Sequence, residues 1–124
     1  MAEIAVQARN AIHRIQRQIS WPPQSASRHL LKRKSRGHLP PNATLADYNG
    51  VIHALVSDPN AVVYAYWHGT TMYVAVVGLS QAETWLVMFD LNGVMESAFV
   101  VERPQHYLNR PVFQRLGSLQ EVAG

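Results

Sequence analysis

The sequence predicts an α+β protein in which two or three N-terminal helices precede a four-stranded antiparallel meander. Residues 1–57 carry apolar side chains at the three- and four-residue steps that are typical of helices. From Ala61 on, the period changes to that of strands, and runs rich in Val, Tyr, Trp, Phe and Thr alternate with turn signals. With 48% apolar and 15% charged residues, the 124-residue chain is typical of a single globular domain.

The first helix is expected over residues 3–19, because one apolar stripe runs along it. Its members are Ile4, Ala8, Ala11, Ile12, Ile15 and Ile19. Trp21-Pro22-Pro23 then ends the helix, since proline has no amide hydrogen to donate and disfavours helical backbone in the residue before it. We therefore interpret residues 1–23 as an N-terminal helix followed by a proline turn.

Two further helices are expected before the strands. Ser27 is a candidate cap for a short second helix, in which Leu30 and Leu31 would point inward and the cations outward. A glycine and two prolines end that helix. Thr44 and Asp47 resemble a capping box at the start of a third helix.

Four strands are expected over residues 61–67, 71–78, 84–91 and 94–101. Asn92-Gly93, between the last two, is the strongest short hairpin signal in the chain. Residues 103–124 have a mixed pattern, so both a fifth strand around Val112 and a tail stay open. We divide the single domain into the N-terminal segment, a core of residues 24–110, and a tail of residues 111–124.

Positive charge is concentrated in the first part of the chain. Residues 1–46 contain eight of the eleven Lys and Arg residues against one acid, Glu3, for a net charge of +7, and the remainder has a net charge of −4. The basic part would attract a polyanion at ordinary salt. A solvated helical face that meets an acidic partner protein is the alternative.

Several classes of function are disfavoured by what the sequence lacks. Without cysteine there is no disulfide framework, thiol chemistry or thiolate zinc site. No His-Glu-x-x-His, His-x-His or glycine-rich phosphate loop occurs, so we expect neither a metal nor a cofactor. No run of about eighteen apolar residues and no signal-peptide pattern occurs, so we expect a cytoplasmic chain that does not contact membranes.

The stretch from Arg28 to Pro40, RHLLKRKSRGHLP, contains five cations and two histidines but no acid. His29 and His38 would lie on opposite sides of a continuous helix, but Gly37 breaks it, and a chain that turns back could bring them together. Imidazoles transfer protons near neutral pH and permanent cations hold phosphate, so this cluster has the groups needed to cleave RNA without a metal. A solvated basic face is the alternative. The catalytic candidates are His29, Lys32, Arg36 and His38, and the nucleic-acid-binding candidates are Arg28, Lys32, Arg33, Lys34 and Arg36.

Three residues outside this stretch are further candidates. His106 and Tyr107 follow the last expected strand, where the end of a sheet could present both to a cleft, although Tyr107 could equally be a packing residue. Trp67 lies at a strand end, where it could stack on a base or belong to the core. His13 is expected at the surface, and His53 at the surface or the edge of the core.

Helices before a four-stranded meander, the basic segment with Arg28-His29-Leu30 and His38, and the strand start Asp58-Pro59-Asn60-Ala61-Val62-Val63 together resemble the barnase/EndoU/colicin/RelE superfamily. Within it, the small nuclease domains of phage and polymorphic-toxin proteins are the most similar in pattern. The likeness spans residues 27–107. It implies a metal-independent endoribonuclease of the toxin kind, with RNA as substrate, tRNA as one candidate, and a cognate antitoxin or immunity protein as a candidate partner.

The same resemblance makes His29 the first catalytic candidate, with Lys32, Arg33, Arg36 and His38 beside it. The family often has a Ser or Thr followed by an aromatic residue near the last strand, which Ser97-Ala98-Phe99 matches poorly, so that His106-Tyr107 would have to substitute. A member of this superfamily that has lost catalysis would keep the fold, and it would keep the basic face for binding. The alternative function is therefore a non-catalytic nucleic-acid-binding or protein-adaptor module, with salt-sensitive binding and no cleavage products.

Overall fold

The computed structural model describes residues 2–124, and three helices precede the sheet, as the sequence predicts. They are α1 (Ala2–Arg17), α2 (Ser25–Ser35) and α3 (Leu45–Val56). The capping box of α3 is confirmed, because the Asp47 amide donates to Thr44 Oγ1 over 3.2 Å and the Thr44 amide donates to Asp47 Oδ2 over 2.8 Å. The prediction that Ser27 caps α2 is wrong, since α2 begins at Ser25.

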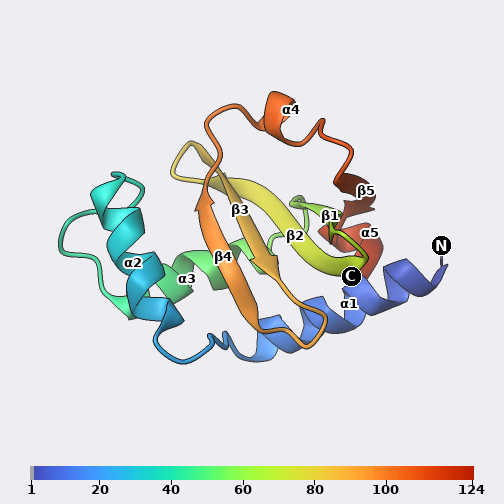
Figure 1. Cartoon of the computed structure of the whole chain (residues 1–124), viewed down its shortest axis with the longest axis horizontal. Coiled ribbons are helices and arrows are strands. Elements are labelled where there is room, and N and C mark those ends of the chain that lie inside the picture. The colour runs from blue at the N-terminus through green and yellow to red at the C-terminus, as the bar shows by residue number, and fades with distance from the viewer. Residues whose placement is uncertain (1) are drawn as a thin grey trace.

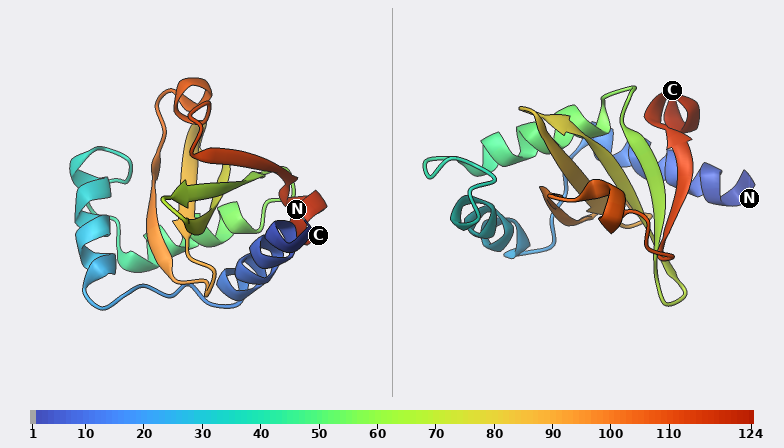
Figure 2. Two further views of the ribbon diagram at one scale, coloured as in Figure 1. Left: turned by 45° about the vertical axis from the view of Figure 1, so that its right-hand side comes forward. Right: turned by 90° about the horizontal axis from the view of Figure 1, so that it is seen from above.

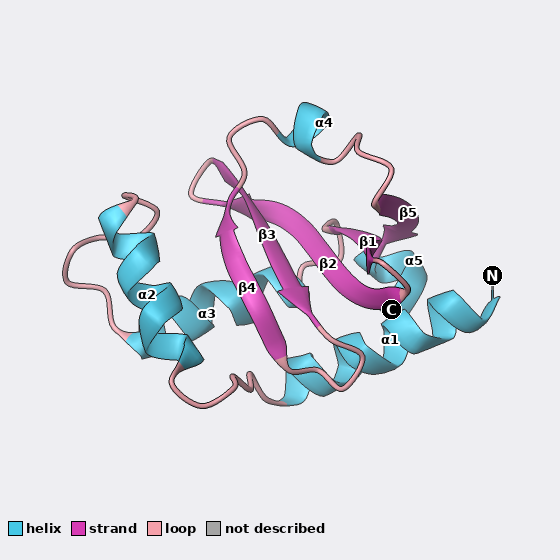
Figure 3. Ribbon diagram, in the orientation of Figure 1, coloured by secondary structure: helices cyan, strands magenta, loops and turns pink. Residues whose placement is uncertain are grey.

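Five antiparallel strands form one sheet, and this corrects the four-stranded prediction. The strands are β1 (Val62–His68), β2 (Thr71–Ser80), β3 (Glu83–Phe89), β4 (Met95–Val100) and β5 (Phe113–Ser118), in the order β4-β3-β2-β1-β5. The first four form the expected meander, and the α+β class is confirmed. Helices α1 to α3 precede the strands in the chain, whereas two short helices lie before and after β5; Figure 3 shows the helices and the strands in separate colours.

The segment expected as a tail is part of the fold. Strand β5 pairs with β1, on the side of β1 that the meander leaves free, and the short helix α5 (Leu119–Ala123) packs beside α1. The helical turn α4 (Pro104–Tyr107) lies in the connection from β4 to β5. Of the two alternatives for residues 103–124, the fifth strand is therefore the correct one.

The main core lies between one face of the sheet and α1, α3 and α5 (Figure 1). Its largest fully buried side chains include Ile12, Ile15, Tyr48, Ile52, Leu55, Val63, Val74, Val76 and Phe89. The opposite face of the sheet carries a smaller cluster, to which Ala75, Leu86, Met88 and Phe113 belong, and the α4 connection arches beside it (Figure 2). This second face is therefore the open face of the sheet.

Helix α2 contacts α3 and lies beside β4 at the edge of the sheet (Figure 1). Two aromatic contacts connect it to the core, because the Trp21 ring lies 5.2 Å from the His29 ring and 5.5 Å from the Tyr48 ring. The buried Tyr48 hydroxyl donates to the Ala98 carbonyl of β4 over 2.6 Å, and burial raises the pKa of Tyr48 to about 12. Tyr48 thus connects α3 to β4 where α2 approaches both.

The face of α2 that packs inward differs from the predicted one. Leu31 is 67% exposed, whereas Arg33 is only 4% exposed. Leu30 and Arg33 are three residues apart and share a side of the helix, while Leu31 is turned about 100° from Leu30. The expectation that both leucines point inward and all cations outward is therefore wrong for Leu31 and Arg33.

The β3–β4 hairpin is fixed against α1. Gly93 adopts a positive φ of 79°, and a β-carbon there would lie only 2.8 Å from Arg14 Cβ. The Met95 amide donates to the Ser20 carbonyl over 2.7 Å, which holds the start of β4 to the chain after α1.

Between residues 2 and 124, each helix is too short or too polar to traverse a bilayer.

Candidate active site

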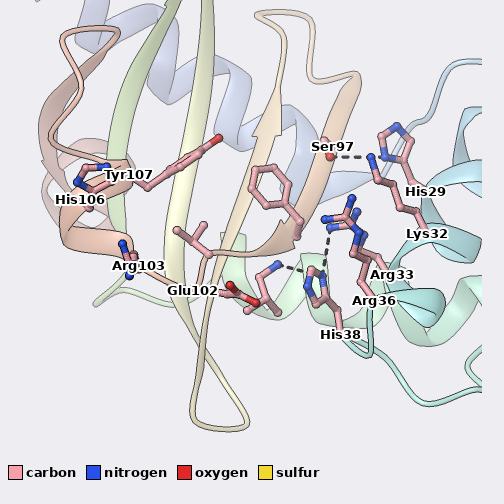
Figure 4. Close-up of a pocket in the computed structure, with 13 residues that line it drawn as sticks. His29, Lys32, Arg33, Arg36, His38, Ser97, Glu102, Arg103, His106 and Tyr107 are labelled. Carbon is pink, nitrogen blue, oxygen red and sulfur yellow. Dashed lines mark hydrogen bonds between the residues drawn. The ribbon is translucent and has the colours of Figure 1, made fainter.

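A cavity of about 540 Å³ opens between α2, strand β4 and the α4 turn (Figure 4). We call it the basic cavity, because four cations line it against one carboxylate, that of Glu102. Its lining residues are His29, Lys32, Arg33, Arg36, His38, Ser97, Phe99, Val100, Val101, Glu102, Arg103, His106 and Tyr107. All six predicted catalytic residues, His29, Lys32, Arg36, His38, His106 and Tyr107, are among them.

Helix geometry explains why one short segment provides so much of this wall. His29, Lys32, Arg33 and Arg36 are spaced by three, four and seven residues, so they form one stripe along α2. After the helix, Gly37 has a φ of 74° and turns the chain back. The His38 amide then donates to the Arg33 carbonyl over 2.9 Å, and its imidazole lines the same cavity as His29.

Arg33 is the buried cation of the cavity. Its Nη1 lies 3.1 Å from His38 Nδ1, and its guanidinium carbon lies 5.7 Å from the centre of the Phe99 ring. Its Nε is buried and has no hydrogen-bond partner among the residues that the structure describes. Burial lowers the pKa of Arg33, and the charged groups that act on that pKa are Tyr48 and Arg36 rather than a carboxylate. Since an unpaired buried donor is costly, the structure leaves this guanidinium short of an acceptor.

The contacts of His38 determine which of its nitrogens carries the proton. Its Nδ1 lies 3.1 Å from Arg33 Nη1 and 3.4 Å from the Val100 amide nitrogen. Both neighbours are donors, so Nδ1 must accept, and the neutral ring then carries its proton on Nε2. Burial, followed by the charge of Arg33, lowers the pKa of His38. At neutral pH His38 is therefore an uncharged imidazole that can donate from Nε2.

His29 lies on the same wall, half-buried, with its Nδ1 3.5 Å from Ser97 Oγ on β4. Burial lowers the pKa of His29, and the neighbouring charges of Arg33, Arg28 and Lys32 lower it further. The imidazole is consequently unprotonated at neutral pH, which is the form that accepts a proton. Three nearby cations thus favour the basic form of His29.

Strand β4 provides the floor, and the sequence prediction did not include its residues. The pairing of β3 with β4 shifts between Met88 and Phe89, so that β4 has a bulge at Glu96. Bulges redirect side chains and are common beside active sites. Ser97 and Phe99 both line the cavity. The sequence does carry a signal for this shared position, because side chains two residues apart on a strand lie on the same face.

The wall opposite α2 comes from the α4 turn, as Figure 4 shows. His106 is exposed there and Tyr107 is half-buried. The Tyr107 ring lies 6.1 Å from the Phe99 ring and 5.5 Å from the Phe113 ring, and Arg110 stacks on it at 4.2 Å. These contacts fix Tyr107 in place. Its position is compatible with both alternatives for this residue, packing in the fold and a role in the cavity.

Three of the predicted nucleic-acid-binding residues lie outside the cavity lining. Trp67 is on the helix-covered face, where it packs against the main core and its Nε1 donates to Gln114 Oε1 over 3.4 Å. Arg28 is exposed, and Lys34 Nζ donates to the Ala43 carbonyl over 3.4 Å. Of the two alternatives for Trp67, its position agrees with the core, whereas its neighbour Tyr66, with the opposite orientation along β1, faces the open side of the sheet.

The remaining histidines are also outside the cavity. His13 is half-buried, and its Nε2 lies 3.0 Å from the Ala123 carbonyl, while the exposed His53 has its Nε2 3.2 Å from the Gln16 carbonyl. Among residues 2–124, no three His, Asp or Glu side chains gather closely enough to hold a metal ion.

No family model, curated protein or solved structure matches this chain. The resemblance to the barnase/EndoU/colicin/RelE superfamily therefore stays a prediction, and the function has to be argued from the site.

The lowered pKa of His38 leads to a prediction about stability. The unfolded chain takes up a proton on this residue near pH 6.5, whereas the folded protein does so only at lower pH. Stability should therefore fall as the pH drops from 7.5 through 6.5 toward the lowered pKa, because the unfolded state binds more protons in that window. Urea unfolding at pH 7.5 and 5.5 measures this.

His38→Asn isolates the contribution of this ring, because the amide oxygen can still accept from the Val100 amide. The variant should lose part of the difference in stability between the two pH values, whereas His53→Asn, outside the cavity, should keep it. An unchanged pH dependence in His38→Asn would contradict the assignment.

Proposed function

We propose that this protein is a metal-independent endoribonuclease, in which the ribose 2′-hydroxyl attacks the adjacent phosphorus and the 5′-oxygen leaves. The observation that carries the proposal is Arg33 in the lining of the basic cavity, since no carboxylate of the described residues pairs with its guanidinium and a histidine lies on either side of it in the sequence. A phosphate oxygen is the kind of acceptor that this guanidinium lacks. RNA supplies both that phosphate and a neighbouring hydroxyl.

His29 is the general base in this proposal. Its lowered pKa leaves it unprotonated at neutral pH, and it faces the floor of the cavity beside Ser97. It removes the proton of the 2′-hydroxyl as that oxygen bonds to phosphorus. Arg28, outside the lining, contributes its positive charge to keep His29 in the basic form.

Arg33 and His38 stabilise the negative charge that develops on the phosphorane oxygens. The guanidinium is permanently charged and lies 5.7 Å from the centre of the Phe99 ring, and His38 adds a neutral N–H donor from Nε2. Lys32 and Arg36 lie on the rim of the same stripe and hold the flanking phosphates of the strand. Arg33 and His38 therefore act in the transition state, whereas Lys32 and Arg36 act in binding.

His106 is the candidate general acid, because it lies on the wall opposite His29 (Figure 4). In an in-line displacement the entering and the leaving oxygen are on opposite sides of phosphorus, so base and acid should also be opposite. His106 donates its proton to the 5′-oxygen as that bond breaks. Tyr107 holds the α4 turn on the sheet through Phe99 and Phe113 and is the alternative donor.

The test is incubation of the protein with labelled tRNA and total RNA in EDTA at pH 7. The expected products are fragments that end in a 2′,3′-cyclic phosphate and a 5′-hydroxyl, because the attacking 2′-oxygen remains bonded to phosphorus. RNA with 2′-O-methyl groups should be resistant, since the nucleophile is blocked. Products with a 3′-hydroxyl, or cleavage of the methylated RNA, would contradict this mechanism.

An intact RNA that is bound in a salt-dependent manner would instead favour the non-catalytic binding module.

As an endoribonuclease of the cytoplasm, the protein would damage cellular RNA unless restrained, so a toxin role with a cognate antitoxin or immunity protein belongs to the proposal. Poor growth of cells that express the wild type, relieved by loss of His29, is the corresponding observation in vivo.

A further inference from the structure

A second cavity, of about 290 Å³, adjoins the basic cavity on the open face of the sheet. Four aromatic side chains line it, namely Tyr66 from β1, Tyr73 from β2, Phe99 from β4 and Tyr107 from the α4 turn. We call it the aromatic cleft. Tyr66 and Tyr73 have no role in the chemistry described above.

The two cavities are neighbours, because Phe99 and Tyr107 line both of them. On one side, Phe99 has the Arg33 guanidinium 5.7 Å from its ring centre. On the other, it belongs to the wall of the aromatic cleft. A ligand whose phosphate lies at Arg33 would therefore place its next group in or beside the aromatic cleft.

The rings of the cleft are held but not covered. Tyr66 and Tyr73 are cross-strand partners with ring centres 6.3 Å apart, and Tyr66 also packs on the buried Phe113 at 5.0 Å. Both tyrosines are half-buried, so part of each ring stays open to a ligand. Rings that are fixed from below and open above are the arrangement on which nucleic-acid bases stack.

Two polar side chains complete the cleft. Glu96 and His68 line it, and both are exposed. Glu96 reaches this face because it sits in the β3–β4 bulge, whereas regular alternation with Ser97 would direct it to the other side. A carboxylate and an imidazole beside a stacking surface can hydrogen-bond to the edge of a base.

We propose that the aromatic cleft is a subsite for an unpaired base next to the cleaved phosphate, so that the substrate is single-stranded RNA. The inference rests on the proposed ribonuclease function. A base in a duplex is stacked and paired on both sides and would have to leave the helix before it could enter. Duplex RNA should therefore be bound through its phosphates alone, and more weakly.

Tyr73→Leu tests the subsite, because leucine fills similar space without a π face. The probe is a short single-stranded 2′-O-methyl RNA, which cannot be cleaved through the 2′-oxygen, so that affinity is measured independently of catalysis. We expect Tyr73→Leu to weaken binding by about ten- to a hundredfold. The matched control is Tyr64→Leu, since Tyr64 lies on the same face and packs on Phe113 but lines neither cavity.

A second probe needs no variant. The wild-type protein should bind a ribose-phosphate strand that lacks all bases about ten- to a hundredfold more weakly than the same strand with its bases. Equal affinities for the two strands, or equal losses in Tyr73→Leu and Tyr64→Leu, would overturn the subsite. If RNA is cleaved to cyclic phosphates but these affinities do not differ, the subsite fails and the ribonuclease proposal stands. If the affinities differ but no RNA is cleaved, the ribonuclease proposal fails and the cleft remains a base-binding site.

Discussion

His29→Ala is expected to lower the rate of RNA cleavage by a factor of about 10²–10⁴, the usual contribution of a general base. The fold should be retained, because His29 is only half-buried, and the loss of its ring contact with Trp21 at 5.2 Å lowers stability but leaves the Trp21–Tyr48 contact in place. Initial rates on a labelled RNA in EDTA measure the loss. Circular dichroism and urea unfolding of the same sample verify the fold.

The pH profile separates a general base from a residue that merely shapes the cavity. Cleavage requires unprotonated His29, whose pKa is lowered by burial and by Arg33, so kcat/KM should stay high below the usual histidine range and fall only in more acidic solution. The residual activity of His29→Ala should lack this acidic limb. His53→Ala is the matched control, since its ring lies outside the cavity and the profile should be that of the wild type. Full activity in His29→Ala would remove the base from the mechanism.

Much of the fold could be predicted because its signals are local. The Thr44–Asp47 capping box and the Asn92-Gly93 turn each depend on residues a few positions apart, and both are present. Strand β5 could not be decided, since it is stabilised by pairing with β1, some fifty residues earlier in the chain. Nothing in the mixed pattern around Val112 indicates such a long-range partner.

The site could be predicted where helical spacing alone assembles it. His29, Lys32 and Arg36 form a stripe on any helix through this segment. The burial of Arg33 could not be predicted, because a cation within a basic run is normally solvated, and only the contacts with His38 and Phe99 reveal its position. The α4 turn places His106 and Tyr107 at the cavity as the sequence suggests. The aromatic cleft could not be predicted from local spacing, because Tyr66 and Tyr73 come together only through the register of β1 with β2.

Arg33→Met should lower the rate of RNA cleavage by a factor of about 10²–10³, the usual cost of removing one donor to a developing oxyanion. The same substitution should raise the free energy of unfolding by about 1 kcal/mol or more, because it replaces a buried cation that lacks a carboxylate partner with an apolar chain of similar shape. Steady-state cleavage assays and urea unfolding at pH 7.5 measure the two effects.

These opposite signs distinguish a functional cation from a structural one. If Arg33 mainly held α2 on the sheet, its loss would destabilise the protein, and activity would fall only because less protein is folded. Lys32→Met is the matched control, since Lys32 is an exposed cation on the same stripe. The free energy of unfolding of this variant should change by less than about 0.5 kcal/mol. Its rate of RNA cleavage should fall less than that of Arg33→Met. An Arg33→Met protein that is less stable than the wild type would show that the guanidinium is satisfied within the fold, and the strongest support for a phosphate in the basic cavity would be lost. An Arg33→Met protein that is more stable but inactive is the result expected when a fold keeps an uncompensated charge for its substrate.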